Sequence, residues 1–190
     1  AFGICEIDSM YVAKAIAQFE RTMISGNSKF DKVGRHEDQF TASELNGFIL
    51  FSKDKNNQTG EHGGDCFHCH TLGNSWLFND FQYRNNGLDS ATTINDFTDH
   101  GRGNISGNPD DYGKFRTPPI RNLTLTAPYM HDGRFATLEE VIDHYDHEVK
   151  RSDTLDPNLA KHPPTGLHLS SDDKAALVAF LRTLTDERFA

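Results

Sequence analysis

The sequence predicts an all-α fold in which a few amphipathic helices are joined by long loops. Apolar residues recur at spacings of three and four in several segments, and capping boxes precede two of these segments. No segment shows the alternation of apolar and polar residues that is typical of a half-buried strand. Between residues 52 and 119 the helical periodicity nearly vanishes. A loop region of this length is unusual in a compact domain unless something else organises it.

Two helices are expected before this loop region. The first covers residues 9–23 with Asp8 or Ser9 as its N-cap, and a polar connector follows at residues 25–39. The apolar face of the first helix would hold Val12, Ile16, Phe19 and Met23. The second helix begins at the capping box Thr41–Glu44 and continues to Phe51.

Two further helices are expected after the loop region. The capping box Thr137–Glu140 opens a helix that continues through Tyr145. A Pro-rich connector follows at residues 156–166. The last helix begins near Ser170 and carries Asp172 and Asp173 in its first turn, where the helix dipole favours acidic residues. Helices joined by long loops are therefore the expected architecture.

The composition excludes some classes of protein. Of the 190 residues, 36% are hydrophobic and 25% are charged, which is typical of a globular chain. The formal net charge is -9, and the Lys and Arg residues do not cluster, so nucleic acid is not expected as a partner. No apolar stretch approaches the roughly 18 to 20 residues that span a bilayer. The first residues resemble no signal peptide, so any export signal would have been removed or would lie upstream.

The segment Cys66–His70 has the pattern Cys-x-x-Cys-His, which is the attachment signature of c-type haem. Thiols at positions i and i+3 lie one helical turn apart, so both can reach the two vinyl groups of one haem. The imidazole of His70 then binds the iron as the proximal ligand. We therefore expect one haem c, covalently bound through Cys66 and Cys69, around which the long loops wrap.

Two other chemistries compete for these cysteines. Zinc would need further ligands, which His62, His68 and His70 could supply. A redox dithiol would need a βαβ context that this sequence lacks. The haem interpretation agrees best with the motif and the all-helical pattern. His62 and His68 are then exposed loop residues, and Cys5 is a free thiol.

The Pro-rich stretch from residue 114 to 134 contains several side chains that could serve a haem. The thioether of Met130 suits the sixth position of the iron, although a Met in a loop more often serves packing. His131 could be a ligand, a proton shuttle or a partner of a haem propionate. Arg116, Arg121 and Arg134 could form bidentate contacts with propionates. Tyr145 would face the apolar side of its helix, and a phenolate can also bind ferric haem.

Several stretches outside the haem motif match one known family. They are Ala17–Asp31, Glu44–Phe51, Thr117–Asn122, Ala127–Gly133 and Thr137–Glu140. Together with Cys66–His70, they make nearly the whole chain resemble the C-terminal haem domain of bacterial di-haem cytochrome c peroxidases and the related MauG proteins. The resemblance implies a cytochrome c-like domain at residues 36–190. Residues 1–35, a helix and a connector, would then be the end of a first haem domain.

The resemblance also implies roles for particular residues. MauG-like proteins carry a Tyr as the distal iron ligand at the position of Tyr145, where the peroxidases carry a Met. We therefore expect Tyr145 as the distal ligand, with Met130 as the alternative. Arg121 is expected to contact the cofactor, and His131 is the candidate catalytic residue. A calcium site would use the backbone carbonyls near Thr126 and Pro128.

The chain has one haem motif where the family has two, and its first residues resemble the middle of a family member. We therefore expect a fragment that acts as the electron-transfer haem domain of a periplasmic peroxidase or MauG-like oxidoreductase. It would take electrons from a small redox protein and pass them to a second haem domain that reacts with hydrogen peroxide. The resemblance also allows a homodimer. The alternative function is that of a stand-alone mono-haem cytochrome that carries electrons.

Overall fold

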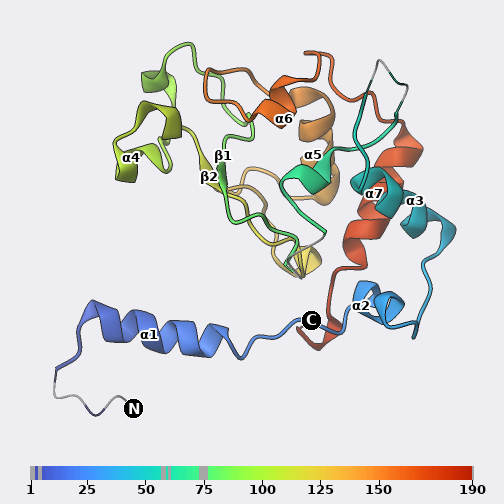
Figure 1. Ribbon diagram of the computed structural model, residues 1–190, viewed down its shortest axis with the longest axis horizontal. Helices are drawn as coiled ribbons and strands as arrows, with labels where there is room; N and C mark the ends of the chain where they lie inside the picture. The colour runs from blue at the N-terminus through green and yellow to red at the C-terminus, as the bar shows by residue number, and fades with distance from the viewer. Residues whose placement is uncertain (1–2, 4–5, 57–58, 60, 73–76, 190) are drawn as a thin grey trace.

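The structure, a computed structural model, describes residues 3, 6–56, 59, 61–72 and 77–189 of the chain (Figure 1). The expected free thiol Cys5 lies outside the described residues. The α-helices are α1 (Ser9–Glu20), α2 (Lys29–Gly34), α3 (Ala42–Phe51), α4 (Gly103–Ser106), α5 (Leu138–Asp143), α6 (Pro157–Ala160) and α7 (Ser171–Arg182). The 3-10 helices are η1 (Cys66–His68), η2 (Ile94–Asp96), η3 (Pro109–Asp111), η4 (Leu123–Leu125) and η6 (Glu187–Phe189), and η5 (His144–Glu148) is a π-helix.

The four longer helices that the sequence predicts are all present, and their capping residues act as expected. Thr41 and Glu44 form a reciprocal capping box at α3, as do Thr137 and Glu140 at α5. The Ser170 side chain accepts a hydrogen bond from the backbone of Asp173 at the start of α7. The helix that Thr137 caps is α-helical only to Asp143 and then continues as the π-helix η5.

Several short elements, among them two helices and a pair of strands, lie where the sequence predicts connectors or loops. Helix α2 interrupts the expected connector 25–39, and its own capping box joins Ser28 to Asp31. Helix α6 lies in the Pro-rich connector 156–166, with Pro157 in its first turn. Strands β1 (Tyr83–Arg84) and β2 (Phe115–Arg116) form a short antiparallel pair within the expected loop region. The prediction of uninterrupted connectors was wrong at these places because each element is only two to six residues long.

The core is built where α3 and α7 cross, side by side in Figure 1. Leu50 and Phe51 of α3 and Leu177 and Phe180 of α7 are buried there. The two backbones approach so closely at Gly47 that an added Cβ would lie 1.9 Å from the carbonyl oxygen of Ala176. Only glycine fits this crossing. Rings around Phe180 extend the core; they belong to Phe30, Phe40, Phe48 and Phe51.

Helix α1 has the predicted apolar face but buries none of its residues. Val12, Ile16 and Phe19 are 47%, 53% and 66% exposed. In Figure 1, α1 extends as a separate arm beside the body of the molecule. By contrast, α2 contributes Phe30 to the aromatic core and Asp31 to a buried ion pair. Within residues 1–35, the second helix therefore packs with the larger expected segment and the first does not.

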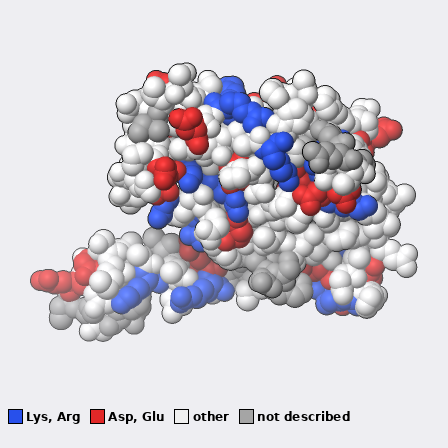
Figure 2. Space-filling model, turned by 45° about the horizontal axis from the view of Figure 1, so that its top comes forward, with Lys and Arg blue, Asp and Glu red and all other residues white. Residues whose placement is uncertain are grey.

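Charged side chains of both signs share the surface. On the face shown in Figure 2, Lys and Arg lie among Asp and Glu instead of forming one basic patch. Among the described residues, no helix is long and apolar enough to cross a bilayer.

Candidate haem site

The two motif cysteines lie on one tight turn against the core. The 3-10 helix η1 covers Cys66 to His68, and the backbone N–H of His70 donates to the Cys66 carbonyl at 2.9 Å. Cys66 packs against the main apolar cluster. Both cysteines are free thiols, and burial raises the pKa of each to about 12, so both are protonated at neutral pH. The predicted turn, with its two thiols one helical turn apart, is therefore present.

The ring of His70 is fixed by the backbone on one side. Its Nδ1 lies 3.1 Å from the carbonyl oxygen of Phe78, which can only accept, so Nδ1 carries the proton. Burial lowers the pKa of His70, which favours the neutral imidazole. Phe78 is buried and adopts φ +54°, a backbone conformation that an aromatic residue rarely adopts. Because Nδ1 carries the proton, the neutral ring has its lone pair on Nε2, and a histidine that ligates a metal commonly has its other ring nitrogen hydrogen-bonded in this way.

The two candidate distal ligands meet at one amide. The side-chain Nδ2 of Asn86 donates to the Met130 sulfur at 3.4 Å and to the Tyr145 hydroxyl oxygen at 3.5 Å. Met130 lies on a loop with φ +73°, whereas Tyr145 lies on the π-helix η5. The structure thus brings both residues to the same place and does not choose between them. Nothing in the sequence pattern indicated Asn86.

The pKa of Tyr145 is raised to about 12, mainly by burial and to a smaller extent by the nearby Cys69 and Cys66. The phenol and the two thiols therefore belong to one environment, although they are almost 80 residues apart in the sequence. The Asn86 hydrogen bond acts in the opposite direction because it stabilises the phenolate. At neutral pH the side chain is a phenol in the structure.

The π-helix that carries Tyr145 is anchored on both sides of that residue. The Nε2 of His144 lies 3.0 Å from the backbone carbonyl oxygen of Asn86. Asp146 accepts a hydrogen bond from the backbone of Leu169 at 3.0 Å and pairs with Lys174 at 2.7 Å. Single π-helical turns are rare and are frequent at functional sites. The wider turn fixes the direction in which Tyr145 leaves the helix.

His131 is exposed, and its ring stacks on Phe115 with centroids 3.6 Å apart. His131 and Asn86 line the same small pocket, together with Phe115 and Phe97. The structure therefore places the candidate catalytic residue near the amide that contacts Met130 and Tyr145.

The three arginines that could hold propionates already have partners. Arg121 is buried and donates to both carboxylate oxygens of Asp31 at 2.8 and 2.9 Å. Arg134 donates to Asp132 at 2.7 Å, and Arg116 lies over the ring of Phe81. The ion pair gives Arg121 a structural role that the sequence did not indicate. Its predicted contact with the cofactor stays a prediction.

The residues expected to hold calcium lie on an exposed loop between η4 and α5. Thr126 and Pro128 are both exposed, and the peptide bond between Ala127 and Pro128 is cis. The Thr126 backbone N–H donates to the Leu123 carbonyl at 3.2 Å. These contacts order the loop, and the calcium site stays a prediction.

The zinc alternative is not supported by the positions of the three histidines. His62 pairs with Asp173 at 2.9 Å, and His68 pairs with Asp54 at 2.7 Å. Among the described residues, the group of metal-ligating atoms that lie together comprises Asp54, Asp65 and His68, without a cysteine. The thiols therefore have no zinc-type ligand set around them, and His68 is not the simple exposed residue that was expected.

Known proteins resemble this chain closely in sequence. It is 32% identical to the methylamine utilization protein MauG of Methylophilus methylotrophus over 97% of this chain and 49% of the relative. It is 32% identical to the cytochrome c551 peroxidase of Nitrosomonas europaea over 98% of this chain and 48% of the relative. Over nearly its whole length, the chain is thus similar to the MauG and cytochrome c peroxidase family. It spans about half the length of these curated relatives. No family model matches it.

Solved structures agree with this family. A MauG-like protein associated with microbial copper homeostasis superposes with a TM-score of 0.75 at 36% identity, over 97% of this chain and 55% of that one. A di-haem peroxidase of Burkholderia thailandensis gives a TM-score of 0.71 over 89% of this chain and 48% of that one. Its identity of 24% supports the fold alone. The helical fold of this chain is thus shared with a MauG-like protein and a di-haem peroxidase.

The residues present fit a covalently bound haem. Haem c requires two thiols, a histidine and a further axial ligand. The chain offers two free thiols on one turn, the imidazole of His70, and the oxygen of Tyr145 or the sulfur of Met130 beside Asn86. The aromatic and aliphatic core behind Cys66 supplies an apolar wall.

Proposed function

We propose that this chain is the electron-transfer haem c domain of a di-haem cytochrome c peroxidase or MauG-like oxidoreductase. It would receive electrons from a small redox protein and pass them to a peroxide-reacting haem on a domain outside this chain. The observation that carries the proposal is the fixed ring of His70, which lies on the same turn as two free thiols. The names of the relatives support the same chemistry.

Each residue has a defined task in this proposal. Cys66 and Cys69 would anchor the cofactor through thioether bonds, and His70 would bind iron through Nε2. Bound haem supplies one-electron chemistry, since its iron accepts and releases single electrons. The Phe78 carbonyl, by accepting the Nδ1 proton of His70, increases the basicity of Nε2 and lowers the reduction potential.

We propose Tyr145 as the distal ligand, with Met130 as the alternative. To bind as an anion, the phenol must lose a proton that burial holds on it, because burial raises its pKa to about 12. The Asn86 amide donates to the oxygen and so stabilises the anion. An anionic oxygen ligand would favour the oxidised state, whereas the Met130 thioether would favour the reduced state.

The remaining assignments rest on the family resemblance. His131 would move protons, since it lines a pocket with Asn86. Arg121 would approach a propionate while it holds Asp31. A calcium ion near Thr126 and Pro128 would complete the site between two domains, and the periplasm would be the location. A homodimer is compatible with this function.

The test is to produce the chain in the periplasm of a strain that matures c-type cytochromes. A Soret band that persists after acid-acetone extraction, with one haem per chain, is the expected result. Hydrogen peroxide should be reduced by the full-length protein and not by this chain alone. A chain that carries haem and turns over peroxide by itself would contradict the assignment to electron transfer. A readily reduced iron with a Met ligand, and no second haem domain encoded upstream, would favour the stand-alone carrier.

A further inference from the structure

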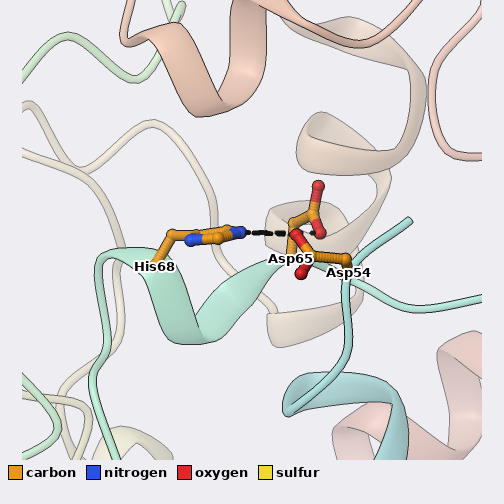
Figure 3. Close-up of side chains that lie close together, drawn as sticks. All are labelled: Asp54, Asp65 and His68. Atoms are coloured by element: carbon orange, nitrogen blue, oxygen red, sulfur yellow. Dashed lines mark hydrogen bonds and ion pairs between the residues drawn. The ribbon is translucent and has the colours of Figure 1, made fainter. Parts of the chain in front are cut away.

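A second group of metal-ligating side chains lies at the haem-attachment turn (Figure 3). Donor atoms of Asp54, Asp65 and His68 all lie within 4.8 Å of one another. The Nε2 of His68 is 2.7 Å from Asp54 Oδ1 and 3.9 Å from Asp65 Oδ1. Figure 3 shows both carboxylates pointing toward the edge of the His68 ring. The haem motif fixes only Cys66, Cys69 and His70 and does not require any of these side chains.

His162, just after α6, lies beside this group. Its Nε2 contacts Asp65 Oδ2, and the two side chains are 10% and 4% exposed. The Asp65 carboxylate is thus almost fully buried beside an imidazole, and the ammonium group of Lys161 also lies next to it. A bound cation would neutralise the negative charge of the Asp65 carboxylate and would also accept the lone pair of the His162 imidazole.

The side chain of Lys161 already places a positive charge among these donors. Its Nζ lies 3.1 Å from Asp65 Oδ2, 3.2 Å from Asp54 Oδ1 and 3.4 Å from His68 Nε2. The position of Nζ therefore marks the point where a cation is attracted by all three residues. Lys161 is 38% exposed and has a flexible four-carbon stem, so its ammonium group can turn into the solvent.

We propose that Asp54, Asp65, His68 and His162 form a binding site for one divalent transition-metal ion, with zinc as the best match. Two carboxylates and two imidazoles are a common ligand set for zinc, whereas calcium and magnesium prefer oxygen ligands only. Lys161 holds the position when no metal is bound and leaves when the ion enters. The site joins the haem-attachment turn to the segment that follows α6.

The test is a calorimetric titration of the haem-loaded chain with zinc chloride. Haem loading removes Cys66, Cys69 and His70 as competing zinc ligands. One zinc ion per chain is expected, and Asp54→Asn and His162→Gln should each weaken binding at least tenfold. These two substitutions lie outside the haem motif and should leave the haem content and the visible spectrum unchanged.

Two further variants make the titration specific. Lys161→Met should strengthen zinc binding about tenfold, because the ion no longer competes with an ammonium group. His62→Ala is the matched control, since His62 also pairs with a carboxylate, that of Asp173, but lies outside the group. Its zinc affinity should equal that of the unchanged chain. An anomalous signal at the zinc edge in crystals should lie between His68 and His162.

Two results would overturn the proposal. Zinc binding that is equal in the unchanged chain, Asp54→Asn and His162→Gln would place the ion elsewhere. Absence of zinc binding in Lys161→Met at millimolar zinc would show that the group is only a network of ion pairs. Both results are independent of the proposed electron transfer, because the haem spectrum is measured in the same samples.

Discussion

The two sides of the candidate haem site are built in different ways. The proximal side comes from a single turn, Cys66–His70, whose histidine is held by a backbone carbonyl at 3.1 Å and whose first cysteine packs on the core. The distal side is assembled from Asn86, Met130 and Tyr145, which come from three distant segments and meet at contacts of 3.4 and 3.5 Å. Attachment is thus encoded locally and rigidly, whereas the distal ligand depends on long-range assembly.

The largest effect is expected when the attachment thiols on the proximal side are removed. Replacing both Cys66 and Cys69 by Ala removes the atoms that form the thioether bonds, so all covalent haem should be lost. The measurement is the Soret absorbance that remains with the protein after acid-acetone extraction. Cys5→Ser is the control and should retain the full haem content. Covalent haem in the double variant would contradict the attachment site.

The second prediction concerns the packing that supports the proximal turn. Phe180→Ala removes a fully buried ring at the crossing of α3 and α7 and should lower the free energy of unfolding by about 3–5 kcal/mol. Phe19→Ala in the exposed helix α1 should change it by no more than about 0.5 kcal/mol. Denaturant unfolding of the haem-loaded chains measures both values. Equal losses would mean that α1 is packed in solution.

The contrast between these two phenylalanines shows what the sequence could predict. Apolar periodicity and the capping boxes predicted α1, α3, α5 and α7 because these signals act within a few residues. The same periodicity does not say what a helix packs against, so the exposure of α1 could not be foreseen. Helix α2 did carry a signal, the Ser28–Asp31 capping box, which the polar composition of its surroundings hid.

The candidate site divides in the same way. The motif predicted Cys66, Cys69 and His70, the family resemblance favoured Tyr145, and the thioether chemistry of Met130 made that residue the alternative. Neither could indicate that one amide would join the two distal candidates. The partners Phe78, Asn86 and Asp31 are set by tertiary contacts across many residues, and a single sequence carries no signal for them.

The third prediction tests which residue is the iron ligand on the distal side. Tyr145→Phe removes the oxygen ligand and should raise the reduction potential by on the order of 100 mV, within the roughly 0.8 V range that axial ligands control. The ferric spectrum should change with it. Tyr129→Phe is the control, because the Tyr129 hydroxyl donates to the Leu123 carbonyl at 2.8 Å. A ferric spectrum that is unchanged in Tyr145→Phe and altered in Met130→Ala would assign the ligand to Met130.

The smallest expected effect tests Asn86 as a positioning residue for that ligand. In Asn86→Ala the phenolate loses its hydrogen bond from the amide, so the oxygen should bind iron more strongly and the potential should fall. A shift of some tens of millivolts is expected, because a hydrogen bond to a charged group contributes about 1.5–3 kcal/mol, only part of which depends on the iron oxidation state. Asn85→Ala is the matched control, since Asn85 donates to Ser152 and Thr154 instead.

Redox titration distinguishes a residue that positions the iron ligand from a residue with a purely structural role, because only the first should change the reduction potential. Asn85→Ala should lower stability and leave the potential unchanged, whereas Asn86→Ala should move the potential in the presence of Tyr145 and have no effect in Tyr145→Phe. The second comparison is decisive, since a hydrogen bond to the phenol can act only where the phenol exists. An equal shift in both backgrounds would assign the effect of Asn86 to Met130 or to the backbone carbonyl that binds His144.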